Sequence, residues 1–366
     1  MEKFQVGREK VGIMNNTTDN NKSINLKATI NDILVTINQE REREIITRRF
    51  GLYDRRETLE QIGELLGITR ERVRQLEKAI LIKLKAVTES GKVAAVNAAE
   101  KIIIRELAEI GRVARVQDLT DRILGVETSN QREQAMVAFI AELAPGLTVV
   151  VQNDNYFHSV GISEYGDSKT IRDEVDKIVS VIKKHGVPLT IEQLHDQLSY
   201  EHPNYVRALA SVSRLLAHLN DDWGLVKWPT VNPKNIRDKI FVVLSENGKP
   251  IHFSEIAKSI KNSNYKRKDV TTQAIHNELI KDSRFVLIGR GIYALDSWGF
   301  DKGTVSDIIA KVLKSSPEPL HRDEIVRRVL KSRQVKETTI LLNLQSKSQF
   351  KRVAKATYVF DLSKSN

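Results

Sequence analysis

A block of about 65–70 residues recurs four times along this chain, beginning near residues 100, 171, 236 and 305. Each copy opens with an amphipathic helix, such as IRDEVDKIVSVIKKHG, and continues with a short break and a second helix, such as TIEQLHDQL. A third amphipathic segment follows, and then a β-rich ending such as FVLIGRGIYAL, although the second copy ends less clearly in WGLVKW. A fixed period of this length indicates a chain of small repeated units. Three helices closed by a β-hairpin predict a winged-helix domain in each copy, and hence a mainly α fold.

The segment before the repeats has a different character. Residues 15–23, NNTTDNNKS, are polar and low in complexity, which predicts a flexible arm. From residue 30 the pattern is helical up to the first repeat. The expected parts are therefore a flexible N-terminal arm at 1–29, a helix-turn-helix at 30–92, winged-helix-like domains at 93–165 and 166–232, a winged helix at 233–300 and a basic winged-helix-like domain at 301–366.

Between residues 58 and 84 the pattern predicts two helices with an abrupt turn between them. Thr58 and Gln61 form a capping box, and Gly67 supplies the positive φ that ends the first helix. Thr69 then caps the second helix, so the pair forms a helix-turn-helix. The apolar residues expected to face the core are Leu59, Ile62, Leu65 and Leu66 in the first helix and Val73, Leu76, Ile80 and Leu84 in the second.

The second helix begins with an unusual crowd of charged side chains. The stretch TRERVRQLEKAI, residues 69–80, concentrates them in the first turn and a half, opposite the apolar stripe. Arginine can hydrogen-bond guanine, glutamate can accept from cytosine, and glutamine can pair with adenine or reach a phosphate. In a helix-turn-helix this part of the second helix enters the major groove. The predicted DNA-facing residues are Arg70, Glu71, Arg74, Gln75 and Lys78.

The composition agrees with a nucleic-acid partner. The chain carries 58 basic and 47 acidic residues, a net charge of +11, although a basic protein without such a partner has the same balance. The excess is largest in residues 301–366, with 14 basic and 7 acidic residues, where nonspecific phosphate binding is expected. The absence of cysteine excludes disulfides, thiolate zinc sites and iron–sulfur clusters. The sequence contains neither a signal-peptide core nor a bilayer-spanning segment, so a cytoplasmic protein without membrane contact is expected.

The run REREIITRRFGLYDRRETLEQIGELLGITRERVRQLEKAILIKLK closely resembles region four of sigma-70 family bacterial sigma factors. The matching elements are REREII, RFGL, TLEQIGELLG, TRERVRQLEKA and the final KLK, about 50 of the 366 residues. The resemblance implies that this domain reads the −35 promoter element in double-stranded DNA. It also makes RNA polymerase, through the flap of its β subunit, a candidate partner. The family's base and phosphate contacts fall on Arg70, Glu71, Arg72, Arg74 and Gln75, and we include Thr58, Thr69 and Lys78 in the predicted interface.

Two observations limit and extend this resemblance. No segment resembles sigma region two, the part whose aromatic residues melt the −10 element, so a complete sigma factor is not expected. The third repeat, from IRDKIFVVLSENG to GRGIYAL, looks like the HARE-HTH winged-helix family. That family includes the N-terminal domain of the RNA polymerase delta subunit, and other members accompany DNA-modifying enzymes and chromatin proteins.

The third repeat also contains a basic run, YKRKDVTT, before its recognition helix. Its cations either contact phosphates or form a solvated face, and we include them in the predicted interface: Lys266, Arg267 and Lys268.

No motif points to catalysis, a cofactor or a metal. His185, His195 and His202 lie close in sequence, but without cysteine or suitably spaced carboxylates they do not predict a metal site. Gly-rich phosphate loops, nucleophile elbows and HExxH motifs do not occur. Tyr293 and Tyr358 end predicted wing strands, a position that favours the core over base stacking.

The sequence thus predicts a non-enzymatic, sequence-specific DNA-binding protein, a sigma factor-like transcription regulator with added winged helices. The alternative is the DNA-recognition subunit of a phage-defence or DNA-modification system, which the HARE-like repeat suggests. A scaffold whose winged helices bind only proteins is a third class, but it leaves the charged helix mouth without a purpose. The target sequence, the sign of regulation and the oligomeric state stay open.

Overall fold

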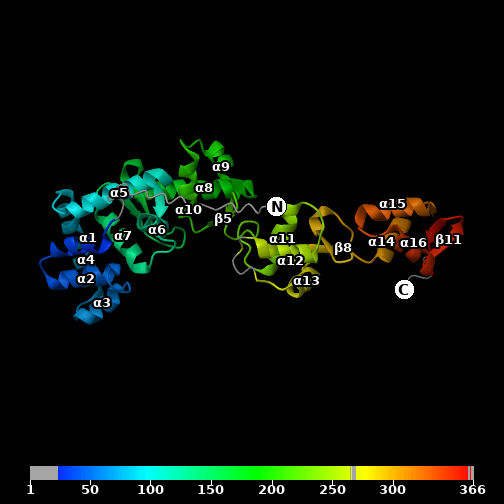
Figure 1. The fold of residues 1–366 in the computed structure, drawn as a ribbon, viewed down its shortest axis with the longest axis horizontal. Coiled ribbons are helices and arrows are strands. Elements are labelled where there is room, and N and C mark those ends of the chain that lie inside the picture. The colour runs from blue at the N-terminus through cyan, green and yellow to red at the C-terminus, as the bar shows by residue number, and fades with distance from the viewer. Residues whose placement is uncertain (1–23, 264, 266–268, 362, 364–366) are drawn as a thin grey trace, which may run out of the picture. The chain divides into compact units, whose positions relative to one another are not determined.

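The computed structural model describes residues 24–263, 265, 269–361 and 363. Over these residues the chain forms 16 α-helices, two short 3-10 helices and 12 strands (Figure 1). The strands make four three-stranded antiparallel sheets. The prediction of a mainly α fold with a helix-turn-helix and tandem winged-helix units is therefore confirmed.

The chain divides into two compact units, residues 1–216 and 217–366, and each is described by itself. The predicted arm at 1–29 falls almost wholly outside the described residues, and the first helix begins within that range, at Leu26. The domain boundaries expected from the sequence remain predictions.

Four helices form the head, which we define as residues 26–89. Its elements are α1 (Leu26–Val35), α2 (Glu40–Phe50), α3 (Leu59–Leu66) and α4 (Arg70–Glu89). The predicted capping box is confirmed: the Thr58 hydroxyl accepts from the Gln61 N–H at 3.3 Å, and the Gln61 side chain accepts from the Thr58 N–H at 2.9 Å. Gly67 ends α3 with a φ of 64°, as predicted. These local signals fix the relative placement of α3 and α4 in the helix-turn-helix.

The prediction of the apolar stripe is wrong for one residue. Leu65 is 54% exposed, whereas Ile62 is fully buried, and Leu59 and Leu66 are partly buried. Because successive residues turn by about 100°, Leu65 lies beside the stripe rather than on it. The helices α2 and α4 cover only the side of α3 that carries Ile62.

The first repeat follows the predicted winged-helix plan. Its strands lie in the order β1-β3-β2, with β3 in the middle. The elements are α5 (Ala94–Ile110), β1 (Val113–Arg115), α6 (Val116–Leu124), α7 (Gln131–Leu143), β2 (Leu147–Val150) and β3 (Ser159–Ile162).

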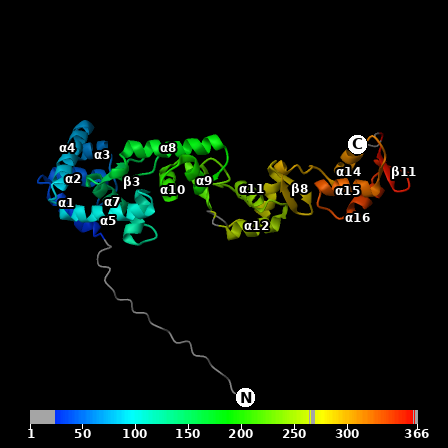
Figure 2. The ribbon, with the colours of Figure 1, turned by 90° about the horizontal axis from the view of Figure 1, so that it is seen from above.

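The head and the first repeat share one hydrophobic core. Ile30 and Ile33 of α1 and Ile80 of α4 belong to the same buried cluster as Phe139 and Ile140 of α7. Both views of the ribbon place α7 beside α1 and α4 (Figures 1 and 2). The third helix of the first repeat therefore packs against the rear of the head.

The second repeat has the same element order, and its third helix is also buried. A 3-10 helix, η1 (Ser163–Tyr165), leads into it. Its elements are α8 (Ser168–His185), β4 (Leu189–Thr190), α9 (Ile191–Leu198), α10 (Pro203–Val212), β5 (Leu216–Leu219) and β6 (Asp222–Leu225). Strands β5 and β6 supply the hairpin that the sequence pattern showed only weakly. Helix α10 packs against β1 of the first repeat, where the Arg115 guanidinium donates to the Ser211 carbonyl.

The third and fourth repeats lie within residues 217–366. The third contains α11 (Ile236–Asn247), β7 (Ile251–His252), α12 (Phe253–Asn262), α13 (Thr272–Lys281), β8 (Phe285–Gly289), β9 (Ile292–Leu295) and the 3-10 helix η2 (Asp296–Trp298). The fourth contains α14 (Val305–Lys314), β10 (Leu320–His321), α15 (Arg322–Ser332), α16 (Glu337–Ser346), β11 (Phe350–Ala354) and β12 (Thr357–Phe360). Their sheets have the orders β7-β9-β8 and β10-β12-β11.

The third and fourth repeats join along β8. The Gln334 N–H donates to the Ile288 carbonyl at 2.9 Å, and the guanidinium of buried Arg333 donates to the Leu287 carbonyl. Tyr293 is 2% exposed and Tyr358 8%, so the prediction that both belong to the core is confirmed.

Candidate nucleic-acid interface

The mouth of α4 presents the predicted side chains to solvent. The Thr69 hydroxyl accepts from the Arg72 N–H at 3.2 Å, which confirms its predicted capping role. Val73 and Ile80 point into the core from the opposite face of the helix. The exposed residues of this mouth are Thr69, Arg70, Glu71, Arg72, Arg74, Gln75 and Lys78.

Several of these side chains are already hydrogen-bonded to one another. Arg74 donates to both carboxylate oxygens of Glu71, at 2.8 and 2.7 Å, and Gln75 donates to Glu71 at 3.4 Å. Arg72 donates to Gln75 at 3.4 Å. The hydrogen bonds from Arg74 hold the pKa of Glu71 below its ordinary value, although both side chains stay more than half exposed. The network therefore holds a guanidinium, a carboxylate and an amide together at the helix mouth, accessible to a ligand.

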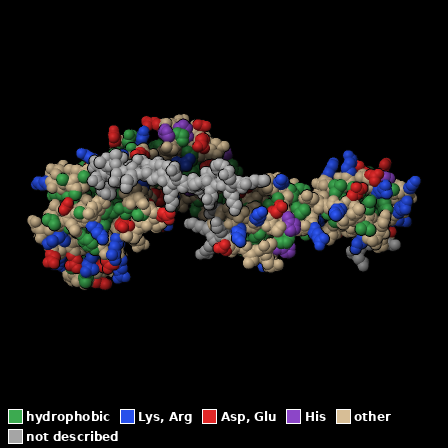
Figure 3. Space-filling model, in the orientation of Figure 1, with side chains coloured by type: hydrophobic (Ala, Val, Ile, Leu, Met, Phe, Trp, Pro, Cys, Tyr) green, Lys and Arg blue, Asp and Glu red, His purple; other side chains and the backbone are tan. Residues whose placement is uncertain are grey.

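The rest of the head holds this mouth in place. Arg41 of α2 donates to the Leu66 carbonyl at the end of α3, at 2.7 Å. Gly63 permits the close turn between α3 and α4, because a Cβ there would lie 2.7 Å from the Ile68 carbonyl oxygen. Side chains of both charge signs gather over the tip of the head occupied by α3 (Figure 3). Thr58, which caps α3, is exposed beside them.

The third repeat is also predicted to contribute three cations to the interface. Lys266, Arg267 and Lys268 fall outside the described residues. The helix that follows them, α13, exposes Gln273 and Asn277 one turn apart, with a hydrogen bond of 3.1 Å between their amides.

The fourth repeat presents a set of exposed cations. Among the described residues, none of these has an ion pair within 4.0 Å: Lys331, Lys336, Lys347, Lys351, Arg352 and Lys355. Lysine and arginine side chains lie over β11 in the space-filling view (Figure 3). This arrangement agrees with the charge excess seen in the sequence.

The structure also gathers residues that the sequence pattern did not connect. A cavity of about 590 Å³ opens between the end of α2, the middle of α4 and the first repeat. We call it the basic groove, because its wall contains Arg49, Arg55, Arg56, Arg115 and His158. These residues come from stretches up to about 110 positions apart, and no local motif marks them as a set.

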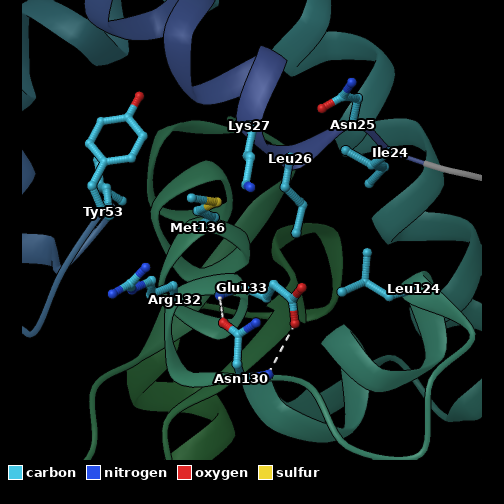
Figure 4. A pocket seen from close by; sticks show the side chains of 11 residues that line it. Ile24, Asn25, Leu26, Lys27, Tyr53, Leu124, Asn130, Arg132, Glu133 and Met136 are labelled. Atoms are coloured by element: carbon cyan, nitrogen blue, oxygen red, sulfur yellow. Dashed lines mark hydrogen bonds between the residues drawn. The ribbon is translucent and has the colours of Figure 1, made fainter.

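A second hollow, of about 570 Å³, lies between α1, the loop after α2 and the start of α7 (Figure 4). Met136 lies in its wall, and the Asn130–Glu133 capping box lies at its rim. The Glu133 carboxylate is engaged in that cap, so the hollow offers no free acid for catalysis. Over the described part of the chain there is also no group of three or more His, Asp or Glu arranged to hold a metal.

None of the described helices is long and apolar enough to cross a membrane.

Comparison with known proteins agrees with the geometry of the head. Residues 39–86 match the family model of sigma-70 region 4. The RNA polymerase sigma factor SigA of a Bacillus species is 46% identical over 66 residues, which are 18% of this chain and 17% of the relative. This chain therefore spans less than a fifth of that relative.

A solved structure, the bacterial selenocysteine-specific elongation factor EF-Sec, aligns over 75% of this chain and 40% of its own, at 12% identity. Its TM-score is 0.20, too low to support an argument about this chain. Repeated units of helices and a hairpin, which resemble winged helices, follow the head. Residues 39–86 thus form a helix-turn-helix that matches sigma-70 region 4.

Proposed function

We propose that this chain is a sequence-specific DNA-binding protein that regulates transcription by recognising a −35-like element. The observation that carries the proposal is the exposed network at the mouth of α4, within a region 4 domain. Arg74 suits guanine, Glu71 accepts from the cytosine amino group, and Gln75 pairs with adenine or reaches a phosphate. The remaining proposed contacts position the helix on the backbone through Thr58, Thr69, Arg70, Arg72 and Lys78.

Selection from a pool of randomised duplexes tests the base-reading role. The full chain is expected to enrich one short motif, and the Arg74→Ala variant to enrich it less sharply. If the wild-type chain enriches no sequence, the proposal is wrong.

RNA polymerase is the proposed partner, through the β flap. The alternative, a DNA-recognition subunit of a defence or modification system, predicts different companions. Purification of the protein from its host under gentle conditions separates the two. Co-purifying polymerase subunits support the regulator, and co-purifying nucleases or methyltransferases support the alternative.

The sequence contains no segment resembling sigma region two, so the proposed regulator does not open promoters by itself. In a run-off assay, core polymerase with this chain as the only added factor is expected not to initiate from linear duplex DNA. A complete sigma factor on the same template is the positive control. Robust initiation from a defined site would show that one of the repeats performs the work of region two.

A further inference from the structure

The basic groove contains more positive charge than its own carboxylates neutralise. Three acidic residues lie in its wall, and each already has a basic partner within 4 Å. These pairs are Arg49–Glu77 at 3.1 Å, Lys85–Glu142 at 2.7 Å and Arg132–Asp54 at 3.8 Å. Each of the three carboxylates is therefore already paired with another cation, although Glu77 also attracts Arg56 electrostatically.

Those other arginines have few partners. Over the described residues, the side chains of Arg55 and Arg56 form no hydrogen bond or ion pair. Arg115 donates only to the Ser211 carbonyl and stacks on the Phe157 ring, with its guanidinium carbon 4.0 Å from the ring centroid. Three guanidinium groups therefore face the groove without a neutralising carboxylate within 4 Å.

Burial makes this concentration of charge costly. It lowers the pKa of both Arg56 and Arg115. Burial, together with the charge of Arg56, also lowers the pKa of His158. A site that penalises cations in this way gains stability when an anion enters it.

The remaining wall suits a phosphate better than a carboxylate ligand. Guanidinium groups bind phosphate oxygens through paired hydrogen bonds, and neutral amides are common donors to the DNA backbone. Four amide side chains line the same cavity: Gln117, Gln131, Gln134 and Gln152.

The basic groove is also continuous with the proposed DNA-reading surface. An adjoining hollow is bordered by Arg74 and Lys78 of the α4 mouth. It shares Glu77, Leu81 and Glu142 with the wall of the basic groove. A DNA backbone that leaves the α4 mouth on this side therefore reaches the groove directly.

We propose that the basic groove binds backbone phosphates of the DNA that flanks the sequence read by α4, with Arg55 and Arg56 of the head and Arg115 of the first repeat as the contacts. The proposal rests on the proposed function and extends its DNA footprint to a surface that the head and the first repeat build together.

The test compares two duplexes and two variants of the full chain. One duplex carries only the selected motif, and the other adds about one helical turn, roughly 10 base pairs, on each side. The variant Arg55→Gln/Arg56→Gln removes two charges without an ion-pair partner within 4 Å from the groove. The control Arg207→Gln removes an exposed charge from α10, outside the wall of the groove.

On the longer duplex, the double variant is expected to bind about 5- to 10-fold more weakly, with a slope of log K against log salt about 2 units shallower. On the short duplex the double variant should bind with wild-type affinity. The Arg207→Gln control should change the affinity for either duplex by no more than about 2-fold. Unchanged binding of the double variant to both duplexes would overturn the proposal, and so would an equal loss on both. A wild-type chain that prefers no sequence would instead contradict the proposed function.

Pyrophosphate distinguishes a small phosphate ligand from DNA. If it binds the free protein, is lost in the double variant, and that variant still binds the longer duplex normally, the groove serves a free phosphate compound and the DNA assignment is wrong. Competition of pyrophosphate with the flanks of the longer duplex alone supports the DNA assignment.

Discussion

The third helix of a winged-helix repeat has two different environments in this molecule. In residues 24–216, α7 buries seven of its 13 residues and α10 five of its 10. In residues 217–366, α13 and α16 each bury only two of 10, spaced four residues apart. A helix that is apolar around much of its surface is packed on several sides, whereas a helix with only a narrow apolar stripe keeps its opposite face exposed to solvent.

The difference indicates that the third helices of the first two repeats serve mainly for packing, whereas those of the last two keep a free face. Helix α7 packs against the rear of the head and α10 against β1, so much of the surface of each helix is buried. Helices α13 and α16 keep their outer faces exposed, and α13 presents the amides of Gln273 and Asn277 there. A third helix that enters a DNA groove is therefore expected from the third or fourth repeat, whereas the first repeat is expected to contact DNA only through the wall of the basic groove.

The largest expected effect comes from breaking α7. Phe139 is fully buried, and its ring centroid lies 4.7 Å from that of Phe50 in the head. Phe139→Ala should lower the free energy of unfolding of residues 24–216 by about 3–5 kcal/mol, because it leaves a cavity in the shared core. The matched change in a free third helix, Leu342→Ala at a residue 64% exposed, should cost less than about 0.5 kcal/mol.

Urea denaturation can assign this loss to the correct unit. Trp223 and Trp228 lie at the hairpin end of the second repeat, so both are replaced by phenylalanine in the background used, and the fluorescence of the remaining Trp298, in the third repeat, follows residues 217–366. In the Phe139→Ala variant, the unfolding transition of residues 24–216 followed by circular dichroism should shift to lower urea. The transition followed by tryptophan fluorescence should keep its wild-type midpoint. A cost below about 1 kcal/mol would show that α7 is not a packing element.

The docking of α10 on the first repeat is the next contact to break. Gly111 has a φ of 118°, and a Cβ added there would overlap the Asn204 carbonyl of α10. Gly111→Ala should lower the free energy of unfolding by about 2–4 kcal/mol, from backbone strain and displaced packing. Gly125→Ala is the control, because Gly125 has a φ of 66° but no atom within 4 Å of the added Cβ. An equal decrease in the melting temperature of the two variants would mean that α10 shifts to make room for the added Cβ at little cost.

The α4 mouth offers a change that affects binding and not stability. Arg74→Ala should weaken binding to the selected duplex about 5- to 100-fold and relax its sequence preference. It removes a proposed base contact and also frees Glu71 from its pair. Competition against randomised duplexes measures both effects, with Arg105→Ala on α5 as the control. Unchanged affinity and unchanged preference would remove Arg74 from the base-reading set.

The smallest expected effect concerns the wing of the fourth repeat. Replacing Lys351, Arg352 and Lys355 with glutamine should leave the sequence preference intact and make the salt dependence of binding shallower by about 1–3 units. The three side chains are exposed and form no ion pair within 4.0 Å among the described residues. The same number of charges removed from the third repeat, at Lys249, Lys258 and Lys261, provides the comparison. An unchanged slope would show that the fourth repeat does not contact phosphates.

The sequence by itself determined the local structure of the head. The caps of α3 and α4 and the turn between them depend on contacts within a few residues, so Thr58, Gln61, Gly67 and Thr69 could be identified from their spacing. The exposed face of α4 followed from helical geometry, and the four repeats followed from their period. These features need no knowledge of which segments meet in space.

The tertiary structure decided which surfaces the repeats leave free. Leu65 fits the helical pattern, yet it is exposed because no neighbouring helix covers that side of α3. The apolar run of α7 could have faced its own repeat alone, but it packs against α1 and α4 as well. The basic groove joins Arg56 to Arg115 and His158 across distant stretches of the chain. Long-range packing sets each of these features, because burial and charge proximity depend on which neighbours arrive and not on sequence spacing.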